Sequence, residues 1–477
     1  MNYSLYTDLY QLTMAQGYFL SGKAEQRASF SMNFRKLPFK GGYAVFCGSA
    51  TLIEMFKNFA FEDDEISYLS SIEAPGGGKL FCKEFLDYLK NMRMSLDMYA
   101  PKEGSLVFPY EPIVRVEGPI LQCQIVETAL LNCINFQTLA ATKATRITAA
   151  ADGRDVAEFG LRRAQGTGSM WGARASYVGG FSSTSNVLAG KEYDIPVSGT
   201  HAHSWVMSFD SELESFREYA RLFPTNSTLL IDTYSVDEGA KNAIIVAKEM
   251  EARGEKMAAV RIDSGDLTWE SRRVRKMLDE AGLDYVGIVL SNDLDEYKIE
   301  SILHEGACVN AFGVGTKYAC CYDQPTLGGV YKLNALEENG QWVPKMKISE
   351  SPEKTTFPGI LNIKRFIDDN GQLAGDMVYD ENETSLDCTI VDPLNRIKNK
   401  KLCGLKGATL LKPIMINGEQ VDFWTIHEAR DFAKKSFDNL DYSRKRNIYP
   451  HIYPVGLELN LSSARDKMIS EALHYSK

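Results

Sequence analysis

The sequence lacks the features of a secreted or membrane-spanning protein. No apolar run approaches the ~18 consecutive residues that a transmembrane helix needs. The first residues, Met1–Ser4, do not begin a basic segment followed by an apolar one, so we expect no secretory signal. The nine cysteines form no CxxC pair, which argues against a zinc ribbon or a dithiol redox site. We therefore expect a soluble protein of the reducing cytoplasm that contacts no membrane.

Basic side chains are outnumbered by acidic ones. The chain has 53 lysines and arginines against 63 aspartates and glutamates, which gives a net charge of −10. Because a nucleic-acid ligand requires a dominant basic face, nucleic-acid binding is not expected. If so acidic a protein binds an anionic substrate, a few arginines must create a local positive field. Those arginines are the first place to look for a site.

The chain is long enough to form several structural units. The 477 residues exceed the ~100–200 residues of an ordinary domain, and 44% hydrophobic with 24% charged residues is a globular composition. Residues 1–120 begin with a helical pattern, for which Thr7 is the expected N-cap, and continue with alternating strands such as Ala28–Phe34. Residues 328–424 return to strand alternation, with three Asn-Gly pairs that mark hairpins: Asn339-Gly340, Asn370-Gly371 and Asn417-Gly418. We predict that these two stretches form one discontinuous domain, followed by a helical segment at 425–477.

Residues 121–327 have a different pattern. A segment without Pro or Gly, from Gln122 to about Ala151, is expected to form one or two helices. Short apolar runs then alternate with helical patterns such as Asp237–Ala252 and Thr268–Ala281, in a repeat of roughly 20–30 residues that suits one strand–helix unit. Because no GxGxxG follows the first strand, we favour a barrel over an open doubly wound sheet. The apolar runs are Val156–Phe159, Ile195–Val197, Leu229–Ile231, Ala258–Ile262, Val286–Leu290 and Val309–Phe312.

Polar groups occur at successive predicted strand ends. In a barrel, catalytic groups gather where strands end and helices begin, so this succession predicts an active site. In chain order the groups are Arg162 and Arg163, the hydroxyl-rich loop Gly180–Asn186, Gly199–Ser204, Asp232, Arg261–Asp266, Asn292-Asp293 and Gly313–Thr316.

Two of these groups indicate particular chemistry. Arg261 and Asp263 share a face of their strand, and burying both is favourable only if a ligand or an ion pair satisfies them. They form either a structural salt-bridge network or a site in which Arg261 grips an anion, while Asp263 or Asp266 holds hydrated Mg²⁺ or ribose hydroxyls. Gly313–Thr316 can present backbone N–H groups and a hydroxyl to a phosphate.

His201 and His203 face the same way on an extended backbone. An HxH pair at a strand end also suits zinc, which would need a third ligand, and the other four histidines lie in a helical pattern or after the barrel. A metal-dependent α/β-barrel hydrolase is therefore one alternative function. A non-catalytic metabolite-binding protein is another.

Several motifs resemble those of nicotinate phosphoribosyltransferases. They are Thr7–Gln11, Glu158–Ala164, Gly199–Ser204 and Val260–Asp266, together with a block from Lys345 to Gly359, and they follow the family's order along nearly the whole chain. The resemblance implies a type II phosphoribosyltransferase fold, in which an irregular TIM-like α/β barrel accompanies a discontinuous α/β sandwich domain. It also implies homodimers whose active sites lie at the subunit interface.

The resemblance further implies the reaction. These enzymes of NAD biosynthesis transfer phosphoribosyl from 5-phosphoribosyl 1-pyrophosphate to nicotinate, giving nicotinate mononucleotide and pyrophosphate. ATP hydrolysis is coupled through a phosphohistidine, and Mg²⁺ is required. By its position in the motif the phosphohistidine is His203. His201 occupies a variable position, to which we assign no chemical role.

Other site residues follow from the resemblance. Asp263 is the second expected catalytic group, and Tyr10 would reach across the dimer to stack on the pyridine ring. The further expected nicotinate contacts are Phe159, Arg162, Ser185, Thr200 and Arg261. The expected contacts to 5-phosphoribosyl 1-pyrophosphate are Ser204, Asp293, Gly313, Gly315 and Thr316, and the expected Mg²⁺ ligands are Asp232, Asp263 and Asp266.

Ser185 predicts which base is used. The related nicotinamide phosphoribosyltransferase carries an aspartate at this position, which recognises the carboxamide. A carboxylate would repel the carboxylate of nicotinate, whereas a hydroxyl can donate a hydrogen bond to it. A serine at position 185 therefore favours nicotinate over nicotinamide as the base.

Overall fold

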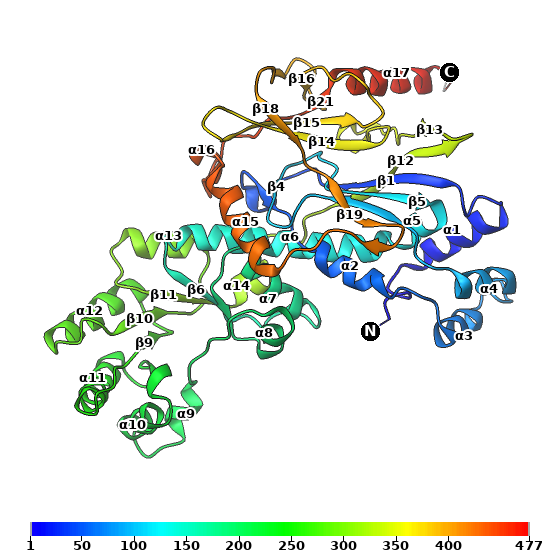
Figure 1. Cartoon of the computed structure of the whole chain (residues 1–477). Helices are drawn as coiled ribbons and strands as arrows, with labels where there is room; N and C mark the ends of the chain where they lie inside the picture. The colour runs from blue at the N-terminus through cyan, green and yellow to red at the C-terminus, as the bar shows by residue number, and fades with distance from the viewer. Residues whose placement is uncertain (1, 476–477) are drawn as a thin grey trace. The chain divides into compact units, whose positions relative to one another are not determined.

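The structure, a computed structural model, describes residues 2–475 and the side chains of residues 2–472. The chain divides into two compact units (Figure 1). Unit 1 combines the N-terminal part up to Leu139 with the C-terminal part from Thr326, and unit 2 is Ala140–Pro325. Both contain helices and sheets, which confirms the α/β fold class. Among the described helices, none has the length and apolar composition that crossing a bilayer requires.

Unit 1 contains a seven-stranded antiparallel sheet built from both ends of the chain. The alternation in the sequence predicted this, since β1 pairs with β5 on one side and with β12 on the other. The strands come in the order β13 (Gln341–Pro344), β12 (Val330–Glu338), β1 (Arg27–Asn33), β5 (Val114–Pro119), β3 (Asp97–Ala100), β19 (Lys412–Ile416) and β20 (Glu419–Gln420).

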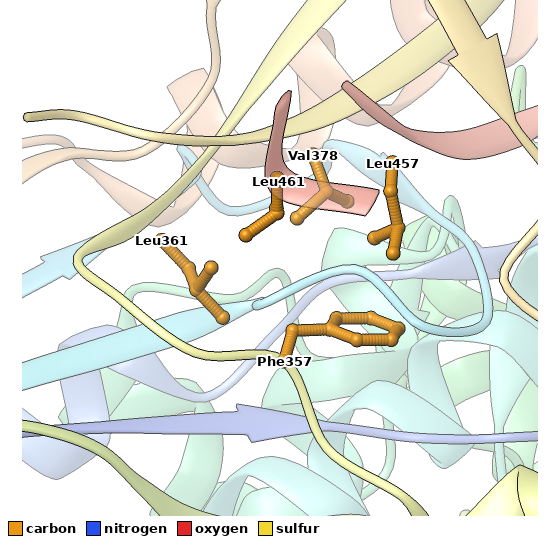
Figure 2. Close-up of a cluster of buried hydrophobic side chains, with 5 residues drawn as sticks. All are labelled: Phe357, Leu361, Val378, Leu457 and Leu461. Carbon is orange, nitrogen blue, oxygen red and sulfur yellow. The ribbon is translucent and has the colours of Figure 1, made fainter. Parts of the chain in front are cut away.

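A second sheet of unit 1 comes only from the C-terminal part. Its order is β17 (Asn399–Lys401), β16 (Thr389–Val391), β21 (Val455–Glu458), β15 (Leu373–Asp380), β14 (Leu361–Ile367) and β18 (Lys406–Thr409). Buried side chains of Phe357, Leu361, Val378, Leu457 and Leu461 join β14, β15 and β21 to α17 (Leu459–Tyr475), as Figure 2 shows. β21 lies within 425–477, which the sequence analysis described as helical, because four residues are too short to display a strand alternation.

The Asn-Gly pairs lie at hairpin turns. Asn339-Gly340 joins β12 to β13, and Asn417-Gly418 joins β19 to β20. All four residues have φ between 50° and 78°, as a two-residue type I′ turn requires. Asn370-Gly371 lies in a longer turn between β14 and β15, in which the carboxylate of Asp368 accepts from the N–H groups of Asn370 and Gln372.

The helices of unit 1 fix its boundary. α1 (Leu9–Leu20) is capped by Asp8, which forms a capping box with Gln11, whereas Thr7 donates to the carbonyl of Ile125. α5 (Ile120–Ile125) packs on α1, β1 and β5 and so belongs to unit 1. The boundary therefore falls inside α6 (Glu127–Ala150) and not at 120/121.

Further elements of unit 1 are β2 (Ala44–Val45), β4 (Leu106–Val107), α2 (Ser49–Lys57), α3 (Asp63–Ser71), α4 (Lys83–Asn91), α15 (Ile426–Asp438) and α16 (Tyr442–Lys445).

Unit 2 is a parallel sheet whose strands alternate with helices, as the repeat predicted. The strand order is β7 (Ser183–Thr184), β6 (Asp155–Glu158), β11 (Ala311–Val314), β10 (Gly287–Leu290), β9 (Ala259–Ile262) and β8 (Thr228–Leu230). The helices are α7 (Gly168–Val178), α8 (Val187–Tyr193), α9 (His203–Met207), α10 (Glu212–Leu222), α11 (Val236–Ala252), α12 (Leu267–Glu280), α13 (Glu296–His304) and α14 (Thr316–Ala319).

The two end strands of this sheet contact the same irregular segment. Thr184 of β7 forms a parallel bridge with Val197, and Leu230 of β8 donates its N–H to the imidazole of His201. The predicted strand Ile195–Val197 is thus reduced to one bridge, since Pro196 has no N–H to offer. Irregular chain takes the place of a regular strand between β7 and β8, which fits the irregular barrel that the sequence analysis expected.

Candidate active site

A cavity of about 130 Å³ lies at the carboxyl ends of β6, β11, β10 and β9. This is where a barrel places its catalytic groups. Eight of the predicted site residues line it: Phe159, Arg162, Arg261, Asp263, Asp293, Gly313, Gly315 and Thr316. Arg163, Ser291 and Asn292 also contribute to the lining.

Arg261 is the centre of the hydrogen-bond network in this cavity. Its Nη1 donates to the hydroxyl of Thr200 over 2.9 Å, and its Nη2 donates to Oδ1 of Asp263 over 3.0 Å. Its Nε donates to the hydroxyl of Ser291 over 2.8 Å. The guanidinium carbon lies 5.5 Å from the centre of the Phe159 ring. Within the described residues, three of the five guanidinium N–H groups are therefore held, and one on each terminal nitrogen is available to an anion.

Ser291 joins the two charges and was missed by the sequence analysis. It accepts from Arg261 and donates to Oδ1 of Asp263 over 2.5 Å, and the residue is only 2% exposed. It follows β10 directly, so the strand-end rule that selected Asn292-Asp293 could have found it. The arrangement holds an arginine and a carboxylate in fixed directions, with both side chains partly buried.

Asn292 shapes the rim of the cavity through its backbone. Its φ of 118° is unusual for a residue other than glycine, and such strain is often found at functional sites. Its side-chain oxygen accepts from the N–H of Asp293 over 2.7 Å. Asp293 is thereby held at the mouth, where it is exposed.

Gly313 has a steric reason to be glycine. A Cβ atom at this position would lie 2.5 Å from the ring of Phe159, closer than any side chain permits. Phe159 can therefore lie flat beneath Arg261 only because residue 313 has no side chain. The predicted role of Gly313 as a phosphate contact remains a prediction.

Glu158 connects the Phe159 loop to the loop that carries Ser185. It is buried at the end of β6, where it accepts from the hydroxyl of Thr184 over 2.7 Å and from the N–H of Gly160. Burial raises the pKa of Glu158, and these two hydrogen bonds oppose the shift. The carbonyl of Glu158 also accepts from the N–H of Ser185 over 2.9 Å. The Ser185 side chain is half-buried.

His203 lies at the start of α9 and is half-buried. Its Nδ1 is 3.1 Å from the hydroxyl of Thr233, which follows β8. Among the described residues, no hydrogen-bond partner contacts Nε2, so this nitrogen is free of competing contacts. Ser204, the next residue, is exposed.

The three aspartates predicted to hold Mg²⁺ have different surroundings. Oδ2 of Asp232 accepts from the N–H of Asp263 over 3.0 Å and from the hydroxyl of Ser264 over 2.6 Å. Its Oδ1 is buried without a hydrogen-bond partner in the described part of the chain. Asp266 caps α12 by accepting from the N–H of Trp269 over 3.0 Å. No three His, Cys, Asp or Glu side chains of the described residues form a group that could hold a metal ion by themselves.

The structure thus brings most of the predicted residues together in unit 2. Thr200 joins the cavity through Arg261, and Asp232 joins it through Asp263. Tyr10 belongs to unit 1, where it lies on α1 and is 49% exposed.

Comparisons with known proteins agree along the whole chain. A model described as nicotinate phosphoribosyltransferase (NAPRTase) N-terminal domain matches residues 5–135, one described as the nicotinate phosphoribosyltransferase (NAPRTase) family matches 155–385, and one for the C-terminal domain matches 362–465. The nicotinate phosphoribosyltransferase of Bacillus subtilis (strain 168) is 42% identical over 477 residues, which cover 98% of this chain and 95% of that protein.

Solved structures are similar as well. The crystal structure of human nicotinic acid phosphoribosyltransferase has a TM-score of 0.84 and 30% identity, with 97% of this chain and 99% of that chain covered. The nicotinate-nucleotide pyrophosphorylase from Pyrococcus furiosus has a TM-score of 0.69 at 22% identity, with 91% and 95% covered. The second likeness shows a shared fold.

Proposed function

The chain belongs to the nicotinate phosphoribosyltransferase family, and from this premise we propose that the cavity of unit 2 binds nicotinate and 5-phosphoribosyl 1-pyrophosphate. The chain is an enzyme of NAD biosynthesis whose reaction gives nicotinate mononucleotide and pyrophosphate. The observation that carries the placement is the network of Arg261 with Thr200, Ser291 and Asp263 above the ring of Phe159.

This network suits a planar acid. The two remaining N–H groups of Arg261 match the two oxygens of a carboxylate, and an aromatic ring beside them can stack on a pyridine. The hydroxyl of Ser185, held near the end of β6, is the group that we assign to the recognition of the acid over the amide. Fixing the pyridine ring correctly is most of what the nucleophilic nitrogen needs.

Other residues of the cavity lining suit phosphates and ribose. Arg162 and Arg163 are exposed at its mouth and provide the local positive field that an acidic chain needs to attract an anion. We assign Gly313, Gly315 and Thr316 to the phosphate, and Asp293 to the ribose hydroxyls. Ser204 is assigned to the phosphoribosyl pyrophosphate as well, on the resemblance alone.

Asp232 and Asp263 are the residues that fit Mg²⁺. The buried Oδ1 of Asp232 has no partner among the described residues, so a cation would satisfy an otherwise costly oxygen. Mg²⁺ keeps several waters and takes one or two carboxylates together with substrate phosphates, so the absence of a three-ligand cage in the described residues suits it. When bound, it would stabilise the negative charge of the departing pyrophosphate. Asp266 is the weaker ligand, because it already caps α12.

We assign the coupling to ATP to His203. The contact of its Nδ1 with Thr233 orients the ring and leaves Nε2 to attack the γ-phosphorus of ATP. Attack forms the N–P bond and breaks the bond to ADP, and hydrolysis later returns the imidazole and phosphate. The phosphoryl group adds negative charge that can change how tightly the site holds its substrates.

We further propose a homodimer with shared active sites. Leu9, Tyr10 and Met14 of α1 are apolar or aromatic side chains that are at least 40% exposed. A partner subunit would cover them, and the ring of Tyr10 would stack on the nicotinate of the partner's cavity. The cytoplasmic location remains a prediction, which rests on the nine free cysteines that a reducing compartment favours.

Release of pyrophosphate tests the proposed reaction. The protein with 5-phosphoribosyl 1-pyrophosphate and Mg²⁺ should release pyrophosphate only when nicotinate is added, with one nicotinate mononucleotide formed for each pyrophosphate. Release that does not depend on nicotinate would indicate a hydrolase and contradict the proposal.

A further inference from the structure

We propose that His201 is a positioning residue whose imidazole ties the loop Gly199–Ser204 to strand β8 and so holds Thr200 and His203 in their working directions. The effects that we expect on nicotinate binding and ATP labelling rest on the proposed function. The hydrogen bond that joins His201 to Leu230, which we call the histidine tie, rests on the structure alone. The sequence analysis assigned His201 no chemical role, and a positioning role keeps it away from the reacting atoms.

The imidazole makes a directed contact with β8. Its Nε2 accepts from the backbone N–H of Leu230 over 3.1 Å, and its Nδ1 faces the carbonyl of Ala202 at 3.4 Å. An acceptor at Nε2 and a carbonyl beside Nδ1 together require the neutral tautomer with the proton on Nδ1. The ring is thus fixed at both nitrogens.

The surroundings of the ring support this tautomer. His201 is 7% exposed, and the ring of Tyr219 on α10 meets it edge to face with a centroid distance of 4.7 Å. Burial lowers the pKa of His201 to about 4; the hydrogen bond to Ala202 opposes this shift, and the nearby Arg261 and His203 add to it. The imidazole therefore stays neutral near pH 7 and keeps its acceptor.

The tie has a consequence on each side of His201. On one side, the hydroxyl of Thr200 donates to the carbonyl of His201 over 3.2 Å and accepts from Arg261. On the other side, His203 reaches the hydroxyl of Thr233, three residues beyond Leu230 on the same chain segment. The loop has no regular secondary structure before α9, and the hydrogen bond from Leu230 to His201 is the contact that joins it to β8 itself, between the contacts of Thr200 and His203 to the flanking segments.

Two substitutions distinguish the hydrogen-bond acceptor of His201 from the space that its ring fills. His201→Phe keeps an aromatic ring against Tyr219 but leaves the buried N–H of Leu230 without an acceptor. His201→Gln places an amide oxygen near the position of Nε2. The matched control is His304→Phe, at an exposed position on α13 in the same unit.

The readouts are KM and kcat for nicotinate and the rate at which [γ-³²P]ATP labels the protein. His201→Phe should raise KM and slow labelling by about tenfold each, the effect expected when a buried donor loses its partner. His201→Gln should stay within about threefold of the unaltered protein, and His304→Phe should match it. Wild-type values in His201→Phe, or an equal loss in His201→Gln, would overturn the proposal.

A spectroscopic measurement covers the case in which His201→Phe does not fold. In the full-length protein with ¹⁵N-labelled histidine, His201 should show a protonated Nδ1 and a bare Nε2. A proton on Nε2 would overturn the tie whatever the kinetics. A protein with the expected tautomer that turns over no nicotinate would contradict the proposed function and support the tie.

Discussion

The guanidinium of Arg261 donates from Nη1 to the hydroxyl of Thr200 over 2.9 Å, which joins the carboxyl end of β9 to the loop that carries His203. The same guanidinium contacts Ser291 and Asp263, so three segments of unit 2 meet at one side chain. On the proposed function, binding of the base and orientation of His203 would therefore depend on a common network.

Substituting Arg261 by lysine should reduce kcat/KM for nicotinate although the charge is kept. A planar fork with five N–H groups becomes a single ammonium, which cannot hold Thr200, Ser291 and Asp263 and also bind a carboxylate. The loss should be about 1–3 kcal/mol, or roughly 5- to 150-fold. Steady-state kinetics measures it, and Arg217→Lys in α10 is an exposed control. Unchanged kinetics at low nicotinate would show that Arg261 serves the fold alone.

Removing the Ser291 hydroxyl should lower activity with little change in stability. Ser291→Ala keeps the direct ion pair of Arg261 and Asp263 but removes the hydroxyl that contacts both, so each side chain loses one of the hydrogen bonds that fix its direction. We expect kcat/KM to fall about tenfold, as for the loss of one charge-assisted hydrogen bond. Ser176→Ala is the matched control, since that buried hydroxyl donates to a backbone carbonyl of its own helix, that of Ala173. Equal effects in the two variants would contradict a specific role for Ser291.

His203→Ala should abolish labelling by [γ-³²P]ATP and the stimulation of product formation by ATP. Basal transfer need not vanish, because the departure of pyrophosphate depends on the arginines and carboxylates of the cavity. Thr233→Val should slow labelling without abolishing it, because Nδ1 loses its contact while Nε2 remains. The bond formed should be labile to acid and stable to base. Labelling that persists in His203→Ala would identify another acceptor.

Stability should decrease with rising pH because of one carboxyl group in unit 1. Burial raises the pKa of Glu111 well above its ordinary 4.5. The negative charge of Asp376 and the hydrogen bond between Glu111 and Asp376 raise it further. The folded state then holds a proton that the unfolded chain releases above pH 4.5, so the free energy of unfolding falls as pH rises from there. Glu111→Gln keeps a donor toward Asp376 and removes this dependence.

Urea unfolding at pH 5 and pH 8 measures the effect of Glu111→Gln. The stability of the variant relative to the unaltered protein should increase between these two values, and the exposed Glu383→Gln should show no such trend. A variant that follows the unaltered protein at both pH values would indicate that Glu111 titrates normally.

The sequence was sufficient for the organisation of unit 2 because the signals there are local. Each strand–helix repeat ends in polar residues, and parallel strands bring their carboxyl ends to one edge. Arg261 and Thr316 could therefore be predicted to lie together at one edge of the sheet, and both line the cavity; Phe159, which also lines it, was expected only from the family resemblance. β7 was missed because Ser183–Thr184 is a polar strand of two residues, which displays no apolar run.

What could not be predicted depends on contacts between distant residues. The tie from His201 to Leu230 and the bridge from Ser291 to Asp263 span 29 and 28 positions and leave no spacing pattern in the chain. The local motif also does not show how a carboxylate is shared. Asp266 belongs to the motif that predicted a metal ligand, and its Oδ1 caps the helix that follows, while its role as a metal ligand stays a prediction.

Substituting Ser185 by aspartate should reduce the preference for nicotinate. The new carboxylate would repel the carboxylate of nicotinate and could accept from the amide of nicotinamide. We expect kcat/KM for nicotinate to fall by at least about tenfold, with a smaller change or a gain for nicotinamide. Ser182→Asp, in the same loop, is the control. Equal losses for both bases would show that residue 185 does not distinguish the carboxylate of nicotinate from the amide of nicotinamide.

The reaction of this enzyme is transfer of phosphoribosyl to nicotinate. Its most direct measurement is the ratio of kcat/KM for nicotinate and nicotinamide in the unaltered protein, with 5-phosphoribosyl 1-pyrophosphate and Mg²⁺, in the presence and absence of ATP. We predict nicotinate mononucleotide as the product, a ratio of at least about 100 in favour of nicotinate, the effect of roughly 2.7 kcal/mol, and stimulation by ATP. Equal turnover of the two bases would contradict the account.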